Sequence, residues 1–182
     1  MLPNKIPNLM ILFMTAFSVW TLPHSNPNGR LNAVLNDLAQ VATDYTIFYK
    51  SIKDFTGQKT AFNTINLHER MVEVQLRNTI NAAVACSPLN ETESQMIMEG
   101  LAKPYPAFMQ DLLEGITNKK PQFEHVNKRP EVLKWLESLY GLSNRLPLAL
   151  EEKVVSKDAE EIERGRAWCN GLFERHISIW RV

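Results

Sequence analysis

The sequence has few of the residue types that build reactive or metal-binding sites. It contains 2 cysteines and 4 histidines in 182 residues, and none of them stands at metal-ligand spacing. His68-Glu69 begins a zinc-protease pattern, but Val72 stands where that pattern needs its second histidine. No serine lies in a G-x-S-x-G turn, and no glycine-rich phosphate loop is present. We therefore expect no enzyme activity, no metal and no cofactor.

The sequence also lacks an excess of charge of either sign. Lysine plus arginine number 20, aspartate plus glutamate number 20, and the formal net charge is +0. A protein that binds a polyanion needs a basic patch or run, and none is visible along the chain. Nucleic acid is therefore excluded as an expected partner.

The one long apolar run lies at the N-terminus. Lys5 is the only charged residue before a nearly continuous apolar segment from Leu9 to Val19. This length is typical of a secretory signal and is short for a membrane-spanning helix. We expect a signal peptide over residues 1–22 and an extracellular protein; an uncleaved membrane anchor is the alternative.

The rest of the chain is the size of one domain. Proline, asparagine and glycine dominate the segment that follows the predicted signal. We expect a flexible leader over residues 23–30 and a single domain over residues 31–182, with no transmembrane segment in the mature chain.

Export makes a disulfide between Cys86 and Cys169 a natural expectation, because an even number of cysteines pairs readily in an oxidising compartment. Closing a loop of that length contributes ~4 kcal/mol in the chain-entropy model. Two buried thiols are the alternative.

Asn90 allows two interpretations. Asn90-Glu91-Thr92 is a glycosylation sequon in a secreted chain. Asn90 with Glu93 also forms the pattern of a helix capping box. We treat a glycan and a complete cap as mutually exclusive.

Apolar residues recur at helical spacing throughout, and no alternating strand pattern is present. The expected helices lie near residues 31–55, 60–86, 90–116, 130–146 and 156–180. Pro104, Pro106 and Pro147 interrupt this pattern. The prediction is an all-α antiparallel bundle of about five amphipathic helices, kinked in the third and fourth.

Two further features bear on packing. Leu67, Met71 and Val74 form a second apolar stripe on the second helix, which indicates neighbours on two sides. Five of the 7 glycines fall inside predicted helices, namely Gly100, Gly115, Gly141, Gly165 and Gly171. Each costs ~1 kcal/mol relative to alanine, so we expect close helix approach there, with room for a ligand as the alternative.

Two stretches resemble a known family. They are Ser87-Pro-Leu-Asn-Glu-Thr-Glu-Ser94 and Gly115-Ile-Thr-Asn-Lys-Lys-Pro-Gln-Phe123, and the second is the more specific. With the order of helices, they make roughly residues 31–180 similar to the fungal hydrophobic surface binding protein A family, related to cell wall galactomannoprotein-like lipid-binding domains.

The resemblance implies a secreted or cell-wall-associated fungal protein that adsorbs to hydrophobic surfaces and assists extracellular hydrolases such as lipolytic enzymes. Related domains are helical bundles that enclose fatty acids. The partner implied here is a fatty acid or an apolar surface.

Our leading hypothesis is non-catalytic binding of an acyl chain or an apolar surface by the bundle. The expected lining residues come from four predicted helices: Phe48, Leu76, Leu101, Phe108, Leu112 and Trp135. The alternative is a secreted effector that binds another protein through its helix faces. That protein would have a continuous core without a cavity and an apolar patch outside the bundle.

Overall fold

The computed structural model describes residues 29–104 and 107–182, and in these residues all regular structure is helical. The predicted signal peptide, residues 1–22, lies outside the described part, as does most of the predicted leader. The first helix already begins at Gly29, two residues earlier than the predicted domain start. The all-α class is confirmed.

Seven helices are present where about five were expected. They are α1 (Gly29–Lys53), α2 (Lys59–Ala85), α3 (Glu91–Leu101), α4 (Phe108–Asn118), α5 (Lys120–His125), α6 (Arg129–Glu151) and α7 (Ser156–Arg181). The predicted third helix is divided at its prolines, since α3 ends before Pro104 and α4 begins at Phe108. In contrast, α6 continues through Pro147 for one more turn, although Pro147 has no N–H to donate to the Ser143 carbonyl.

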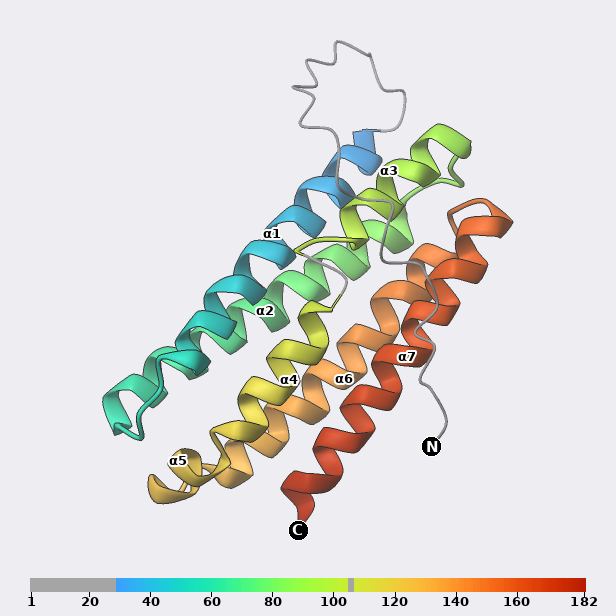
Figure 1. Cartoon of the computed structure of the whole chain (residues 1–182). Helices are drawn as coiled ribbons and strands as arrows, with labels where there is room; N and C mark the ends of the chain where they lie inside the picture. The colour runs from blue at the N-terminus through green and yellow to red at the C-terminus, as the bar shows by residue number, and fades with distance from the viewer. Residues whose placement is uncertain (1–28, 105–106) are drawn as a thin grey trace, which may run out of the picture.

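The long helices form two antiparallel hairpins. α1 packs mainly against α2, and α6 packs mainly against α7. The hairpins meet where α2 lies beside α6, and α4 covers the opposite side between α1 and α7 (Figure 1). Each hairpin thus buries its apolar face against the other, which gives one core.

A cluster of aromatic rings joins the two hairpins near one end of the bundle. Phe62 of α2 stacks on Trp135 of α6, with 5.1 Å between ring centroids. Phe123 of α5 stacks on Phe55 at 4.5 Å and meets Trp135 edge-on at 6.0 Å. Trp180 of α7 completes the cluster, at 6.0 Å from Phe123. Such offset and edge-to-face pairs are the arrangements that aromatic rings prefer.

The Lys-Lys-Pro-Gln-Phe segment closes this end of the bundle. Lys119 donates a hydrogen bond to the Phe55 carbonyl just beyond α1, at 2.8 Å. Lys120 donates to the Ile179 carbonyl at the end of α7, at 2.9 Å. Cations at the C-terminal ends of helices are favourable because carbonyl groups point outward there. The segment therefore fastens two helix ends while Phe123 fills the core between them.

Two of the five helical glycines allow close approach. A Cβ at Gly115 would lie 3.0 Å from the Tyr49 ring, and one at Gly100 would lie 3.1 Å from Leu38. Both glycines let α1 pack tightly against α3 and α4, as expected. Gly141, Gly165 and Gly171 have nothing within 4 Å of such a Cβ, so neither close approach nor an enclosed ligand explains them.

We expect Gly165→Ala to raise the free energy of unfolding by ~1 kcal/mol, because it removes backbone freedom from the unfolded chain and adds no clash. Chemical denaturation measures the change. Gly115→Ala is the matched control and should gain less, since its Cβ would press on Tyr49. Equal gains in both variants would contradict the assigned packing.

Candidate functional site

The predicted lining residues all reach the interior of the bundle. Five of them are buried, and Leu101, at the end of α3, is partly exposed and packs against the core. They come from five helices: Phe48 from α1, Leu76 from α2, Leu101 from α3, Phe108 and Leu112 from α4, and Trp135 from α6.

These side chains pack against one another and against neighbouring rings. Phe48 meets Trp135 edge-on, with 6.2 Å between centroids. Phe108 lies between Tyr45 at 6.0 Å and Tyr49 at 5.6 Å, both edge-to-face. The interior is therefore filled with aromatic side chains between the hairpins; we call this region the seam. α4 contacts α1 through the ring of Phe108 and at Gly115.

A polar pair crosses this seam. The Tyr45 hydroxyl of α1 and the Ser143 hydroxyl of α6 lie 3.2 Å apart. Burial raises the pKa of Tyr45, and nearby Cys169 and Glu69 raise it further. Tyr45 is therefore a neutral hydrogen-bonding group that joins the two hairpins inside an apolar region.

Glu69 is a second polar group in the core. Its side chain is only 2% exposed, and its Oε1 has no hydrogen-bond partner in the described structure. Burial, together with repulsion and hydrogen bonding from Glu73, raises its pKa to about 8, against the weaker opposing effect of Arg70 and Lys134. At neutral pH Glu69 is therefore mostly protonated and can donate a hydrogen bond.

Sequence reasoning missed this polar interior, although one signal for it was available. Glu69 follows Ile65 by four residues and precedes Val72 by three, which puts an acid on the buried stripe of α2. Ser143 carried no such signal, because its partner Tyr45 lies 98 positions away in the sequence.

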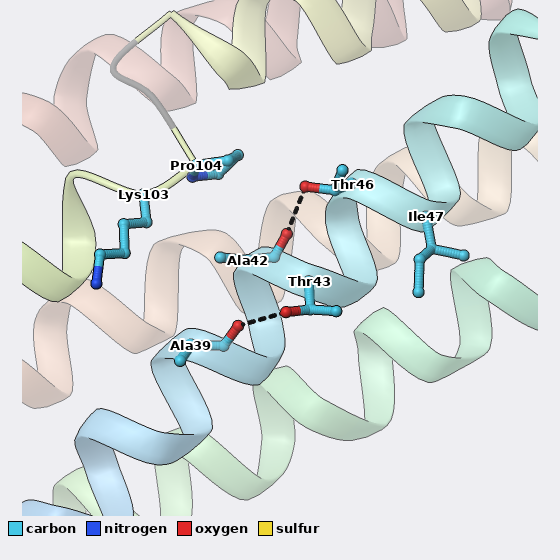
Figure 2. A pocket seen from close by; sticks show the side chains of 7 residues that line it. All are labelled: Ala39, Ala42, Thr43, Thr46, Ile47, Lys103 and Pro104. Atoms are coloured by element: carbon cyan, nitrogen blue, oxygen red, sulfur yellow. Dashed lines mark hydrogen bonds between the residues drawn. The ribbon is translucent and has the colours of Figure 1, made fainter.

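A shallow groove also lies on the outer side of α1. It has a volume of about 430 Å³ and is lined by Ala39, Ala42, Thr43, Thr46, Ile47, Lys103 and Pro104 (Figure 2). Thr43 and Thr46 donate back to the carbonyls of Ala39 and Ala42, at 2.9 and 2.8 Å. A second hollow of about 210 Å³ shares Ala39 and Lys103 with it. The groove is largely apolar and was not predicted.

Two titratable side chains, Cys169 and His176, lie partly or fully inside the bundle. Burial raises the pKa of the Cys169 thiol to about 11, which keeps it protonated. His176 of α7 bonds through Nδ1 to the Thr117 hydroxyl of α4 at 2.7 Å, and burial lowers its pKa. Among the described residues, no group of three or more histidine, cysteine, aspartate or glutamate side chains could hold a metal ion.

The two cysteines are not joined by a disulfide. Cys86 follows α2 at the end of the bundle where Leu89 bonds to the Lys153 carbonyl. Cys169 lies 13 residues inside α7, which begins at Ser156, or about 20 Å along the helix at 1.5 Å per residue. A disulfide requires Cα atoms within about 7 Å. The structure therefore does not support the predicted pairing.

Asn90 forms the complete capping box of α3. Its Oδ1 accepts from the Glu93 N–H at 3.0 Å, and Glu93 Oε2 accepts from the Asn90 N–H at 3.1 Å. The side chain is exposed, and the cap uses the amide oxygen whereas a glycan attaches to the amide nitrogen. The cap and a glycan are therefore compatible, which corrects their treatment as exclusive. Glycosylation stays a prediction.

Within residues 29–104 and 107–182, no helix has the length and apolar character needed to cross a membrane.

The raised pKa of Glu69 predicts a pH dependence of stability. The unfolded chain loses this proton near the ordinary pKa of 4.5, whereas the folded protein keeps it up to about pH 8. The stabilising effect of the protonated, buried group is thus complete below pH 4.5 and is lost as the pH rises to about 8.

We therefore expect Glu69→Gln to stabilise the protein at pH 9 by on the order of 3 kcal/mol and to change little at pH 4. Urea denaturation across this range is the measurement. Glu160→Gln, at an exposed position of α7, is the control and should have a smaller effect. A stability gain for Glu69→Gln that does not vary with pH would contradict the account.

The chain is similar to a known protein family and to several solved structures. The family model "Hydrophobic surface binding protein A" matches residues 31–152. The solved structure of Afmp4p in complex with palmitic acid is 23% identical and has a TM-score of 0.79, with 82% of this chain and 99% of that chain covered.

Two domains of the Penicillium marneffei MP1 protein are also similar. Ligand binding domain 1, complexed with arachidonic acids, is 16% identical with a TM-score of 0.76, and 84% of this chain and 99% of that chain are covered. Ligand binding domain 2, complexed with multiple arachidonic acids, is 11% identical with a TM-score of 0.71, with 83% and 94% covered. At these identities the likeness establishes the fold. No curated protein matches the chain.

The family model covers well over half of the chain, and it includes both sequence stretches that carry the resemblance. The chain therefore belongs to the hydrophobic surface binding protein A family.

Proposed function

We propose that this protein is an extracellular, non-catalytic lipid-binding protein that takes up the acyl chain of a fatty-acid-like ligand between its two hairpins. The observation that carries the proposal is the seam itself, an aromatic and aliphatic interior that the Tyr45–Ser143 pair crosses. Similar solved structures with this fold hold palmitic or arachidonic acids.

The apolar part of the seam suits an acyl chain. Each CH₂ group removed from water contributes ~0.8 kcal/mol, so a long chain offers ~10 kcal/mol before the costs of ordering and binding. Phe48 and Trp135 would form one wall, because their rings meet edge-on across the seam, and Phe108 would border the chain from α4, where it now lies against Tyr45. Leu76, Leu101 and Leu112 extend the same apolar lining toward α2, α3 and α4.

The polar pair suits the other end of the ligand. Tyr45 and Ser143 bring two hydroxyls to one point in an otherwise apolar region, at 3.2 Å from each other. A carboxyl group placed there would accept from both, which removes the cost of burying it without partners. Protonated Glu69 on the adjacent helix adds a further donor near this point.

The proposed opening lies between α1 and α4. Phe108 of α4 lies edge-on against Tyr45 and Tyr49 of α1. The two helices also approach closely at Gly115, and α4 is fastened to α7 nearby by the Thr117–His176 hydrogen bond, so the end of α4 that carries Phe108 would be the part that moves. The segment before α4 contains Pro104 and carries no helix across residues 103 and 104. We propose that Phe108 swings away from the two tyrosines and that the acyl chain takes its place.

The proposed setting is the cell exterior. An N-terminal signal over residues 1–22, a glycan on Asn90 and association with the cell wall are all part of the proposal. A protein that takes up acyl chains there would assist lipolytic enzymes by removing their products from the lipid phase.

A second candidate function has a specific observation in its favour. The core is filled and an apolar stripe is exposed outside the bundle, which is the arrangement expected of an interaction protein that binds another protein through its helix faces.

Native mass spectrometry of the purified chain incubated with palmitic acid tests the proposed function. We expect a mass increment of one or a few fatty acids, retained by the folded protein and absent with a short-chain acid such as butyrate. A mass that stays at the value of the polypeptide with long-chain acids would contradict enclosure.

The role of the polar pair can be tested separately. Tyr45→Phe should weaken palmitate binding by roughly tenfold and leave binding of the corresponding alkane unchanged, because one hydrogen bond to the carboxyl group is lost. Isothermal titration with both ligands measures this difference. Tyr140→Phe is the control, since the Tyr140 hydroxyl bonds to Glu174 on the surface. Equal loss for acid and alkane would show that Tyr45 acts only through packing.

A further inference from the structure

One carboxyl oxygen inside the bundle is left without a partner. The side chain of Glu69 is only 2% exposed, and its Oε1 has no hydrogen-bond partner among the described residues. A buried polar atom without a partner costs free energy, so such atoms are rare in folded proteins. This oxygen therefore points to a ligand that supplies the missing hydrogen bond.

Glu69 lies level with the Tyr45–Ser143 pair. Gln75 of α2 donates to the Asp37 side chain of α1 at 3.0 Å, which sets the register of the antiparallel hairpin. Glu69 precedes Gln75 by six residues, so it lies level with about residue 43 of α1, ~3 Å along the axis from Tyr45. The ionised form of Glu69 also contributes to the raised pKa of Tyr45, as expected for neighbouring side chains. The unpartnered oxygen thus belongs to the same polar point as the two hydroxyls.

The cations around Glu69 lie at the rim of the bundle. On its own helix, His68 and Glu73 are half-buried and Arg70 is exposed, and α6 contributes exposed Lys134. Arg70 and Lys134 lower the pKa of Glu69, but by less than burial and Glu73 raise it. Both of these cations remain in water, outside the region where the head group of a ligand would lie.

The facing groups of α1 and α7 are neutral or acidic. From α1, neutral Tyr45 faces Glu69, and the adjacent Asp44 is buried and accepts from Gln40 at 2.7 Å. From α7, Cys169 acts on the same Tyr45, and burial keeps its thiol protonated. These two helices therefore add no positive charge to the polar point.

The described interior contains no buried lysine or arginine. Its buried polar and charged side chains are Asp44, Glu69, Thr79, Ser94, Asp158 and His176. His176 bonds to Thr117, and burial lowers its pKa. An ionised carboxylate in an apolar region without a cation is costly. The charge of a bound fatty acid must therefore be offset by a proton.

We propose that Glu69 holds the head group of a bound fatty acid through one proton shared between the two carboxyl groups, so that the protein retains fatty acids at neutral pH and releases them in alkaline solution. One carboxyl donates that proton to an oxygen of the other, while the hydroxyls of Tyr45 and Ser143 donate to the head group. The inference rests on the proposed function and adds to it the residue that selects the head group. A long-chain alcohol is retained at both pH values, because its hydroxyl donates to Glu69 whether or not that carboxyl is ionised.

The pH of release follows from the burial of Glu69. Burial and Glu73 raise the pKa of Glu69 to about 8, so the shared proton is present at pH 7 and is lost at pH 9. A carboxyl group in water has an ordinary pKa of ~4.3, so the free fatty acid is ionised at both values. Above pH 8 two carboxylates would meet at one buried point and repel each other. Binding that requires this one proton weakens about tenfold between pH 7 and pH 9.

Isothermal titration at pH 7 and pH 9 tests the inference, with palmitic acid and hexadecanol each supplied as a cyclodextrin complex. For the natural chain, we expect palmitate to bind about tenfold more weakly at pH 9 than at pH 7 and hexadecanol to bind about equally at both. Glu69→Gln keeps a neutral donor at every pH, so its affinity for palmitate should not change over this range. Glu160→Gln, at an exposed position of α7, is the control and should behave as the natural chain. Circular dichroism at both pH values confirms that each chain is folded.

An affinity of the natural chain for palmitate that is equal at pH 7 and pH 9 would overturn the inference while the proposed function stands. The same pH dependence in Glu69→Gln would overturn it as well, and so would a loss of hexadecanol binding at pH 9 as large as that of palmitate. If the natural chain binds neither lipid at pH 7, the proposed function fails and the inference fails with it.

Discussion

The structure depends on the contact between two helical hairpins, α1–α2 and α6–α7. Each hairpin has one apolar face, and each face is buried by packing against the other. The ring contacts around Trp135 are where this happens: Phe62 stacks on it from α2, and Phe48 meets it edge-on from α1. α4 and α5 then cover the remaining side, with Phe108 against α1 and Phe123 inside the ring cluster. The interior seam and its polar pair both follow from this pairing of hairpins.

The same constraint connects the structure to lipid binding. A seam held by ring contacts and by side-chain hydrogen bonds such as Tyr45–Ser143 and Trp135–Asn66 can part without breaking the hydrogen bonds of any helix. An acyl chain that enters replaces one set of apolar contacts by another, so the free-energy cost of opening is offset by burial of the ligand.

Helix periodicity predicted most of the fold. The boundaries of α2 and α7 and the start of α6 were expected within one residue or two, because Gly57, Pro130 and the Ser156 region carry local stop and start signals. The end of α6 was expected five residues too early, since the helix continues through Pro147 to Glu151. The break between α3 and α4 was expected as a kink in one helix, since Pro104 interrupts the helical pattern. Burial of the predicted lining residues followed from their place on the apolar stripes.

What the sequence did not predict depends on contacts between distant positions. The apolar stripe of Leu67, Met71 and Val74 predicted a neighbouring helix, but these side chains are exposed in the described structure. Whether another helix covers a stripe depends on the arrangement of the whole bundle and not on the local sequence. The pairing of Tyr45 with Ser143 and the tightness of Gly115 against Tyr49 likewise depend on how hairpins dock. The number of cysteines predicted a disulfide, but it contains no information on where each cysteine lies along its helix. Cys86 lies at the end of α2 and Cys169 well inside α7, so the two are far apart.

The most direct test of the central claim is a crystal structure of the protein grown with palmitic acid. The account predicts an acyl chain between α1 and α4, with its carboxyl group at Tyr45 and Ser143 and with the ring of Phe108 displaced. A lipid that lies only in the outer groove along Ala39 and Ile47, with the seam still filled by Phe108, would contradict it.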